Sequence, residues 1–214
     1  MLDLVWMTLL GYLLGSISGS LVLGRLRGVD IRSMGSGNAG GTNALRSVGW
    51  LFALVVVLID IGKGVIAALV IPALPPLFGG DLPLATGGVA ALCGLASVIG
   101  HVWPVYFGFR GGKGAGTAIG VIAVVAPWCI LPLVVVWLVA LLGTGYVGLA
   151  TVLAGLSLVP SMWLLGPDPL APGLGALSIA LAGLLLFTHR GNLARLKSGT
   201  ENRFEKARVL KRRQ

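Results

Sequence analysis

The sequence predicts an all-α fold: a polytopic bundle of membrane-spanning helices. Of its 214 residues, 56% are hydrophobic and only 11% are charged. The mean hydropathy of +0.96 lies far above that of a soluble domain. Crossing a hydrocarbon core of about 30 Å takes about 20 apolar residues, so the spans occupy most of the chain. We therefore expect a single transmembrane domain over residues 1–214, with a short basic tail from about residue 190.

The first three helices are predicted from apolar segments at Leu4–Gly24, Leu51–Ile71 and Leu84–Trp103. The connection between the first two carries four arginines, whereas the connection between the second and third carries one charge, Asp81. Because basic loops stay in the cytoplasm, the N-terminus is expected outside. The third helix then returns to the cytoplasmic side, where Arg110 and Lys113 follow it.

The charges of the second half require an even number of crossings. One formal charge, Asp168, lies between residues 114 and 188, and a strongly basic tail follows. Hydropathy alone gives three apolar blocks, so one must be divided, and Pro127 and Pro132 would each remove a helix hydrogen bond. The expected helices are 115–126, 129–143, 145–165 and 173–189. The result is seven spans with the C-terminus in the cytoplasm.

Two small-residue features are expected to serve packing. Gly11, Gly15 and Gly19 form a seam along the first helix, and such seams let helices approach closely in lipid. Cys93 and Cys129 fall inside apolar stretches without a shared local spacing. We expect them to be core residues rather than a disulfide or a metal pair.

Most of the unusual polar residues lie in segments that this topology places on the cytoplasmic side. Two of these segments are rich in glycine: MGSGNAGGTNALR at 34–46 and GGKG at 111–114. Glycine-rich turns can align backbone N–H groups around a phosphate, and a nearby Arg or Lys supplies charge. The two turns therefore predict two bound phosphates. A simpler alternative stays open, namely flexible loops whose charges only orient the protein.

Three other interpretations of these features are rejected. Gly35, Gly37 and Gly40 fit a dinucleotide-binding pattern, but they follow a membrane helix, and Asp60 falls inside the next one. The turn around Lys113 lacks the first glycine and the following Ser or Thr of a nucleotide-binding loop. The net charge of +9 does not indicate nucleic acid, because the basic residues lie in short clusters between apolar segments.

Three longer motifs contain these turns: GSGNAGGTNALR at 35–46, GHVWPVYFGFRGGKGAGT at 100–117 and HRGNLARLKSGTE at 189–201. With GSISGSLVLGRLRGVDIR before the first and DIGKG at 60–64, the chain resembles the bacterial acyl-phosphate:glycerol-3-phosphate acyltransferase family over its whole length. The resemblance implies a seven-helix enzyme of the bacterial cytoplasmic membrane, in contact with lipids, with its active site facing the cytoplasm. It implies acyl transfer from acyl phosphate to the 1-hydroxyl of glycerol 3-phosphate, giving lysophosphatidic acid and phosphate.

The resemblance also implies roles for individual residues. The expected catalytic residues are Lys113, His189, Ser36 and Arg46. The expected substrate-binding residues are Asn38, Thr42, Asn43, Gly111, Gly112, Gly114, Thr117, Asn192 and His101. Either His189 or a phosphate oxygen of a substrate takes the proton, and the resemblance favours the phosphate oxygen. No cofactor or metal is expected, because acyl phosphate is already an activated mixed anhydride.

The segment 145–149 departs from the family pattern. Relatives usually have serines after the tyrosine, whereas this chain has Val147 and Gly148 after Tyr146. We expect that a hydroxyl contact to substrate is missing. Two alternatives stay open: a backbone N–H, Thr144 or Thr151 replaces that contact, or the affinity for glycerol 3-phosphate is reduced. Introducing serine at position 148 is then expected to lower the Michaelis constant.

Other polar residues have structural alternatives. Asp60 and Lys63 lie three apart on one helical face and are expected to form an ion pair that braces the bundle. His101 ends the third helix, where an amphipathic ring at the interface is common without a function. For Arg195 three roles stay open: pairing with Glu201, binding an anionic headgroup, or holding the tail inside.

Two other function classes stay open. Glycine-rich turns at membrane depth also suit a transporter or channel for phosphate or glycerol 3-phosphate, although no internal repeat relates the two halves. A non-catalytic lipid-binding scaffold would leave the Asn and Thr density between residues 36 and 43 unexplained.

Overall fold

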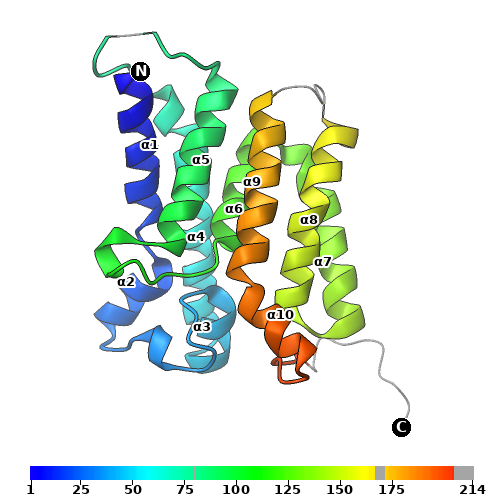
Figure 1. Ribbon diagram of the computed structural model, residues 1–214. Helices are drawn as coiled ribbons and strands as arrows, with labels where there is room; N and C mark the ends of the chain where they lie inside the picture. Colours follow the sequence, from blue (N-terminus) through cyan, green and yellow to red (C-terminus); the bar gives the residue numbers. More distant parts are fainter. Residues whose placement is uncertain (80, 167–171, 205–214) are drawn as a thin grey trace. The chain divides into compact units, whose positions relative to one another are not determined.

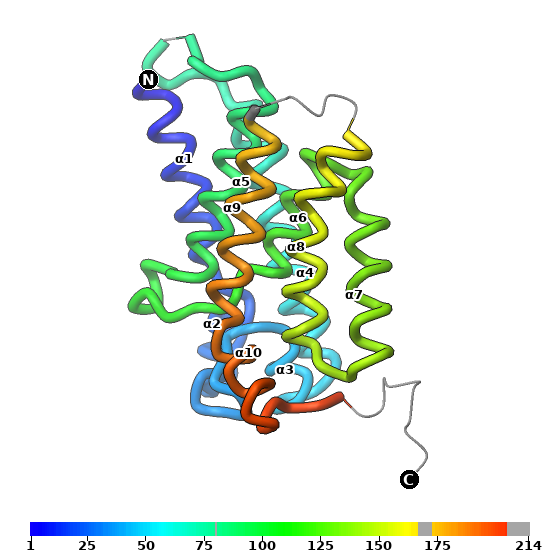
Figure 2. The backbone as a smooth tube through the Cα atoms, turned by 45° about the vertical axis from the view of Figure 1, so that its right-hand side comes forward, coloured from blue at the N-terminus to red at the C-terminus, as the bar shows by residue number. Residues whose placement is uncertain are grey.

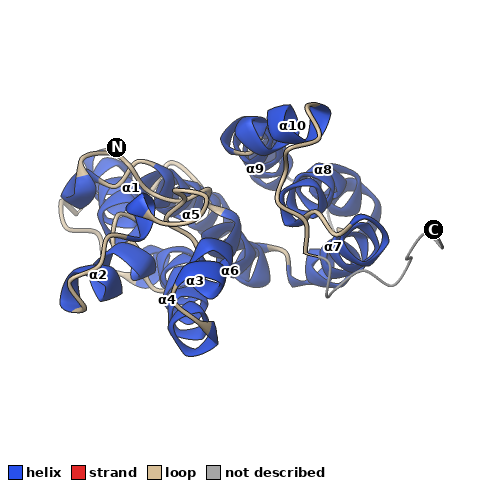
Figure 3. Ribbon diagram, turned by 90° about the horizontal axis from the view of Figure 1, so that it is seen from below, coloured by secondary structure: helices blue, strands red, loops and turns tan. Residues whose placement is uncertain are grey.

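The computed structural model describes residues 1–79, 81–166 and 172–204, and this part of the chain consists of helices and loops without a β-strand (Figure 1, Figure 3). The all-helical class predicted from hydropathy is therefore confirmed. The chain divides into two compact units, Met1–Val125 and Ala126–Gln214. The single transmembrane domain over residues 1–214 stays a prediction. Asp168 and the basic residues after Phe204 lie outside the described residues.

The described residues of unit 1 form the α-helices α1 (Leu2–Gly15), α2 (Gly19–Leu26), α3 (Gly41–Ser47), α4 (Trp50–Leu69), α5 (Thr86–Val102) and α6 (Ala115–Val125). Short 3-10 turns lie at η1 (Ile31–Ser33), η2 (Ile71–Ala73) and η3 (Val105–Phe107). The helix α1 packs along α5, and α4 packs along α6 (Figure 2). Between them the core is filled by fully buried aliphatic side chains, including Met7, Val56, Val89 and Val121.

The predicted glycine seam on α1 lies against α5. A Cβ atom at Gly11 would lie 2.5 Å from the carbonyl oxygen of Cys93, and one at Gly15 would collide with the backbone of Ser97. Such contacts require small residues, because the two backbones approach one another directly. Gly19 instead faces α4, where a Cβ atom would lie 3.1 Å from the side chain of Ile59. The packing role is thus confirmed, with the seam shared between two neighbouring helices.

The prediction of one continuous first helix over Leu4–Gly24 was wrong. The segment breaks at residues 16–18 into α1 and α2, which are bent by 48°. Glycine and serine pairs are common at sharp bends, and the sequence reads GSISGS here. At the break, the carbonyl oxygens of Gly15 and Ile17 accept hydrogen bonds from Lys63 Nζ at 2.8 and 3.0 Å. A side chain from α4 therefore satisfies carbonyl groups at the break.

Unit 2 contains η4 (Pro127–Cys129), α7 (Ile130–Thr144), α8 (Val147–Leu165), α9 (Pro172–Thr188) and α10 (Arg190–Lys197). The helix α8 packs between α7 and α9. The long apolar run divides at Pro127, which confirms the predicted division. Pro132 lies in the first turn of α7, where a missing N–H removes no helix hydrogen bond.

Among the described residues, four segments are long and apolar enough to cross a membrane: Trp50–Ala73, Thr86–Phe107, Pro127–Thr144 and Val147–Leu165. The number rises to six if the bent pairs α1 with α2 and α9 with α10 each make one span, and α6 is a shorter apolar helix. Large apolar side chains such as Leu58, Leu131 and Val139 are exposed on these helices, as expected of surfaces that face lipid. The coarse prediction of a helical membrane protein therefore holds.

Candidate active site

The first glycine turn connects η1 to α3. Gly35 and Gly37 have φ angles of +55° and +72°, a region that favours glycine because a Cβ atom is strained there. Donor side chains on this segment and on α3 reach the surface to different extents: Ser36, Thr42 and Arg46 are exposed, and Asn38 is half-buried. Hydroxyl, amide and guanidinium groups thus come from one short stretch.

Asn43 holds this turn together from inside. Its side chain is 1% exposed. Its Oδ1 accepts a hydrogen bond from the Ser36 N–H at 2.9 Å, and its Nδ2 donates to the carbonyl oxygens of Ile31 at 3.0 Å and Met34 at 2.9 Å. Both ends of the amide are engaged with the backbone of the loop. The structure therefore shows Asn43 shaping the turn.

The second glycine turn is anchored to the end of α5. The N–H groups of Gly111 and Gly112 donate to the carbonyl oxygens of Val102 and His101, each at 3.1 Å. The half-buried Lys113 follows directly, and the chain enters α6 two residues later. The N–H groups of Gly111 and Gly112, which were expected to bind a phosphate, are thus already hydrogen-bonded to main-chain carbonyl groups. The side chain of Lys113 and the N–H groups of the first turn of α6, which have no carbonyl partner within the helix, lie next to each other at this turn, and both are groups that can bind an anion.

Arg32 connects the two turns. Its Nη1 donates to the carbonyl oxygens of Phe107 and Arg110, each at 3.1 Å, and its Nη2 pairs with Asp30 Oδ2 at 2.8 Å. Hydrogen bonds from Arg32 hold the pKa of the Asp30 carboxyl below its ordinary value. The ion pair is therefore present at neutral pH and is lost only as the pH falls through that lowered pKa.

A close backbone contact also joins the turns. A Cβ atom at Gly112 would lie 2.7 Å from the carbonyl oxygen of Ala39, which belongs to the first turn. The two glycine turns therefore lie at the same end of unit 1, next to α2 and α3 (Figure 1).

A buried charge cluster lies beneath the second turn. Lys63 Nζ lies 3.2 Å from Asp60 Oδ1 and 2.8 Å from His101 Nδ1, and these three side chains are all nearly inaccessible to solvent. Asp60 Oδ1 also accepts from the Gly19 N–H at 3.2 Å. The predicted ion pair between Asp60 and Lys63 is confirmed, whereas the participation of His101 was not foreseen. At 3% exposure, His101 is buried, so the interpretation as an interfacial ring was wrong.

Thr117, which was expected to bind substrate, is fully buried in the first turn of α6. Its hydroxyl has no hydrogen-bond partner within the part of the chain that the structure describes. On the facing helix, a Cβ atom at Gly64 would collide with the Thr117 carbonyl oxygen. The structure thus places Thr117 in the contact between α4 and α6.

His189 lies at the bend of 51° between α9 and α10 in unit 2. The ring is 5% exposed, and its Nδ1 lies 2.8 Å from the carbonyl oxygen of Leu185. Because a carbonyl oxygen only accepts, Nδ1 carries a proton, and in the neutral ring Nε2 holds the lone pair. A ring oriented in this way has the acceptor that a proton transfer needs.

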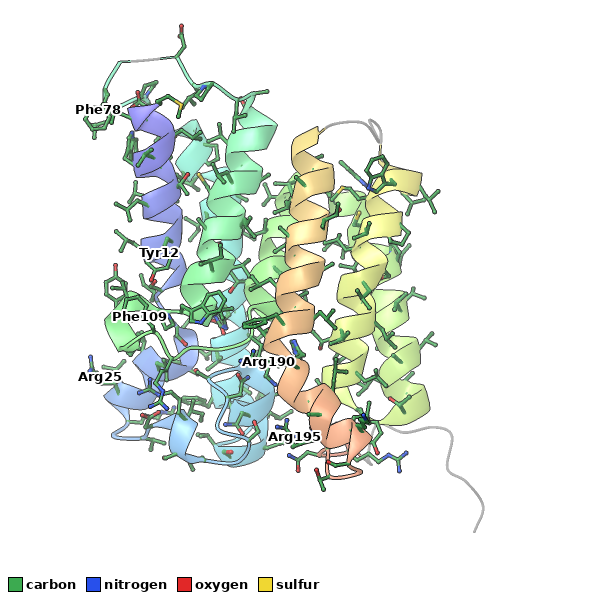
Figure 4. The ribbon with its side chains drawn as sticks, in the orientation of Figure 1. Tyr12, Arg25, Phe78, Phe109, Arg190 and Arg195 are labelled. Atoms are coloured by element: carbon green, nitrogen blue, oxygen red, sulfur yellow. The ribbon has the colours of Figure 1, made fainter. Side chains whose placement is uncertain are left out.

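Glu201 clamps two side chains of α10. Its Oε1 accepts from Asn192 Nδ2 at 2.6 Å, and its Oε2 accepts from Arg195 Nε at 2.7 Å. Arg195 is labelled on α10 in Figure 4. Of the three roles left open for Arg195, the structure shows the pairing with Glu201. Within the third motif, Glu201 therefore fixes the side chain of Asn192.

A family model described as "Glycerol-3-phosphate acyltransferase" matches residues 5–199. This chain belongs to that acyltransferase family. A glycerol-3-phosphate acyltransferase of Shouchella clausii (strain KSM-K16) is 44% identical, with the match covering 95% of this chain and 97% of that protein. The one of Aquifex aeolicus (strain VF5) is 38% identical over 94% of this chain and 98% of that protein.

The acyltransferase also resembles a solved structure. The crystal structure of PlsY (YgiH), described as an integral membrane glycerol 3-phosphate acyltransferase in its glycerol 3-phosphate form, matches with a TM-score of 0.82 at 38% identity. The match covers 94% of this chain and 95% of that chain. The family and its membrane fold are thus supported by sequence and by structure.

The contact between Gly148 and Asn192 bears on one expectation for this acyltransferase. A Cβ atom at Gly148 would lie 2.8 Å from Cβ, Cγ and Nδ2 of Asn192. Position 148 therefore has no room for a side chain while Asn192 stays where it is. The expectation that serine at position 148 restores a contact and lowers the Michaelis constant did not take this neighbour into account. Positions 148 and 192 are far apart in the sequence, so no local pattern revealed this contact.

Replacing Gly148 by serine is instead expected to raise the Michaelis constant for glycerol 3-phosphate. Asn192 must move, and a displaced hydrogen bond to a charged group costs about 1.5–3 kcal/mol, or roughly tenfold or more in affinity. Steady-state kinetics with purified protein measure the change. Gly143→Ser is the control, because a Cβ atom at Gly143 meets nothing within 4 Å. A Michaelis constant at or below the unmodified value in Gly148→Ser would contradict the expectation.

Proposed function

We propose that this protein transfers a fatty acyl group from acyl phosphate to the 1-hydroxyl of glycerol 3-phosphate, giving 1-acylglycerol 3-phosphate and inorganic phosphate. Two glycine turns that meet at one end of unit 1, with Lys113 and Arg46 beside them, carry the proposal. They suit a reaction between two phosphate-bearing substrates. The solved PlsY structures, one in a glycerol 3-phosphate form and one in a lysophosphatidic acid form, support the same acceptor and product.

The reaction needs positioning more than activation. The 1-hydroxyl oxygen attacks the carbonyl carbon of acyl phosphate, a C–O ester bond forms, and the bond from that carbon to the phosphate oxygen breaks. The phosphate leaves with the electron pair, and the hydroxyl proton passes to a phosphate oxygen, with His189 Nε2 as the alternative acceptor. Because the donor is an activated anhydride, holding the reactants and stabilising the developing negative charge supply the catalysis.

The residues divide into those that contact substrate and those that shape the turns. We assign Lys113 to the donor phosphate and the developing oxyanion, and Ser36, Asn38, Thr42 and Arg46 to phosphate and hydroxyl groups. Gly111, Gly112 and Gly114 shape the second turn, and the buried Asn43, His101 and Thr117 act through the positions of the turns. His189 and Asn192 of unit 2 hold glycerol 3-phosphate, and Glu201 orients Asn192.

For the topology we propose seven spans in the bacterial cytoplasmic membrane, with the N-terminus outside, the C-terminus inside and the active site facing the cytoplasm. Six long or bent spans together with α6 correspond to the seven apolar segments. The four arginines between residues 25 and 46 favour the cytoplasm for the first turn. The 11 residues of α6 fall short of a full span, and local thinning of the bilayer accommodates such a helix.

Purified protein supplied with acyl phosphate and labelled glycerol 3-phosphate tests the proposal. Labelled lysophosphatidic acid is expected as the product, and acyl coenzyme A is expected to give none. Product from acyl coenzyme A alone would replace the proposed donor. If neither donor gave product, while labelled glycerol 3-phosphate crossed the membrane of sealed vesicles, the transporter alternative would take its place.

A further inference from the structure

His101 connects the buried ion pair to the second glycine turn. On one edge of the ring, Nδ1 lies 2.8 Å from Lys63 Nζ. On the other edge, Nε2 lies so close to Gly112 that a Cβ atom on this glycine would collide with it. The main chain of His101 contacts the same glycine, since its carbonyl oxygen accepts from the Gly112 N–H at 3.1 Å.

The contacts of Lys63 define the protonation of the ring. An ammonium group has three protons and no acceptor, and Nζ has three partners within 3.0 Å: the carbonyl oxygens of Gly15 and Ile17, and His101 Nδ1. Nδ1 therefore accepts, and the neutral ring carries its proton on Nε2. The reverse arrangement would need a neutral lysine beside a charged imidazole. An alkyl amine is a stronger base than an imidazole, so the proton stays on Lys63.

Asp60 balances the charge of Lys63. Its Oδ1 lies 3.2 Å from Nζ and 3.4 Å from His101 Nδ1. The cluster therefore contains one ammonium, one carboxylate and one neutral imidazole. It joins α4 both to the break after α1 and to the end of α5, where the second turn begins.

We propose that His101 is a positioning residue: Lys63 fixes its ring in the Nε2–H form, and the ring holds Gly112 and thereby Lys113 in place. The contact extends to the first turn, because a Cβ atom at position 112 would also lie 2.7 Å from the Ala39 carbonyl oxygen. Gly112 thus lies between the ring and the first turn, and a shift of the ring displaces both. The inference rests on the proposed role of Lys113 in holding phosphate.

Nitrogen-15 NMR of histidine-labelled protein tests the tautomer without reference to activity. The chain has two histidines, so the spectrum contains two imidazoles, and His189→Gln assigns the other signal to His101. An unprotonated Nδ1 and a protonated Nε2 are expected. In Lys63→Met, the ring is expected to take up a proton beside Asp60, which shifts Nδ1 to the protonated position. A protonated Nδ1 in the unmodified protein would overturn the proposal, and so would an unchanged spectrum in a folded Lys63→Met variant.

His101→Asn tests whether the His101 ring holds the second glycine turn in place. This variant also tests the proposal if Lys63→Met does not fold. The shorter amide still offers Lys63 an acceptor but removes the ring edge beside Gly112. The turnover number is expected to fall about 100-fold, since a displacement of about 1 Å is enough for such a loss. The control is Cys93→Ala, a buried change on α5 that faces α1 and is expected to keep its turnover.

A double-variant cycle supplies the readout that a general loss of stability would not give. Gly112→Ala is expected to lower the melting temperature strongly in the unmodified protein and less in His101→Asn, because the colliding ring edge is gone. Additive effects would overturn the proposed contact. The melting temperatures and NMR spectra test the placement of His101 separately from the proposed acyl transfer. If both are as expected but Lys113→Ala stays active, the proposed role of Lys113 fails, whereas the proposed placement of His101 stands.

Discussion

Replacing Lys113 by alanine is expected to lower the turnover number for acyl transfer about 100- to 1,000-fold while the helices stay folded. Losing one preorganised group that stabilises a developing oxyanion costs this much in other acyl transfers. Lys113 lies between Gly112 and Gly114, and the turn is held by main-chain hydrogen bonds to α5 that the substitution leaves intact. Release of labelled lysophosphatidic acid measures the turnover, and circular dichroism measures the helix content.

Two further variants sharpen this prediction. Lys197→Ala removes the same charge from an exposed position on α10, and its turnover is expected to stay near the unmodified value. Arg46→Ala, which removes a guanidinium from the last turn of α3, is expected to reduce turnover as Lys113→Ala does. Full activity in Lys113→Ala would remove this lysine from the site.

Replacing Asn43 by aspartate is expected to abolish activity through collapse of the first turn. The substitution keeps the shape of the side chain but turns its donating nitrogen into an oxygen that faces the carbonyl groups of Ile31 and Met34. Two hydrogen bonds are lost, and a charge is buried against acceptors at 1% exposure. Each buried polar group left without a partner costs about 1–3 kcal/mol, and more if it is charged.

Proteolysis measures the collapse of this turn directly. Faster cleavage within residues 34–46 of Asn43→Asp is expected even without substrate, which a residue that only contacts substrate would not show. Asn38→Asp is the matched control, because Asn38 is half-buried on the same turn, and its backbone is expected to stay protected. Unchanged protection in Asn43→Asp, together with lost activity, would return Asn43 to the substrate-binding residues.

The sequence allowed prediction of the features that arise from local spacing. Apolar length located most of the helices, and proline divided the long run at Pro127. The ion pair of Asp60 and Lys63 followed from their three-residue separation on one helix. The common location of the two glycine turns followed from the distribution of charge between the helices.

Contacts between distant segments could not be predicted from one sequence. His101 lies 38 residues after Lys63, and no spacing rule relates two separate helices. The sequence showed that position 43 is polar. An asparagine side chain can hydrogen-bond to nearby main-chain groups as readily as to a ligand, so its role could not be predicted. The break after Gly15 was visible in the repeated glycine and serine residues, yet the apolar residues around it concealed the bend.

The ion pair of α4 bears on how the protein enters the membrane. An isolated charge at the centre of an inserting helix costs about 2.5–3.5 kcal/mol, whereas Asp60 and Lys63 neutralise each other within a single helix. The segment therefore reaches the bilayer during synthesis without net charge. Gly15 and Ile17, whose carbonyl oxygens accept hydrogen bonds from Lys63, precede α4 in the sequence, so they are synthesised first. His101 is synthesised later, as part of α5. All members of the cluster except the imidazole therefore precede α5 in the order of synthesis.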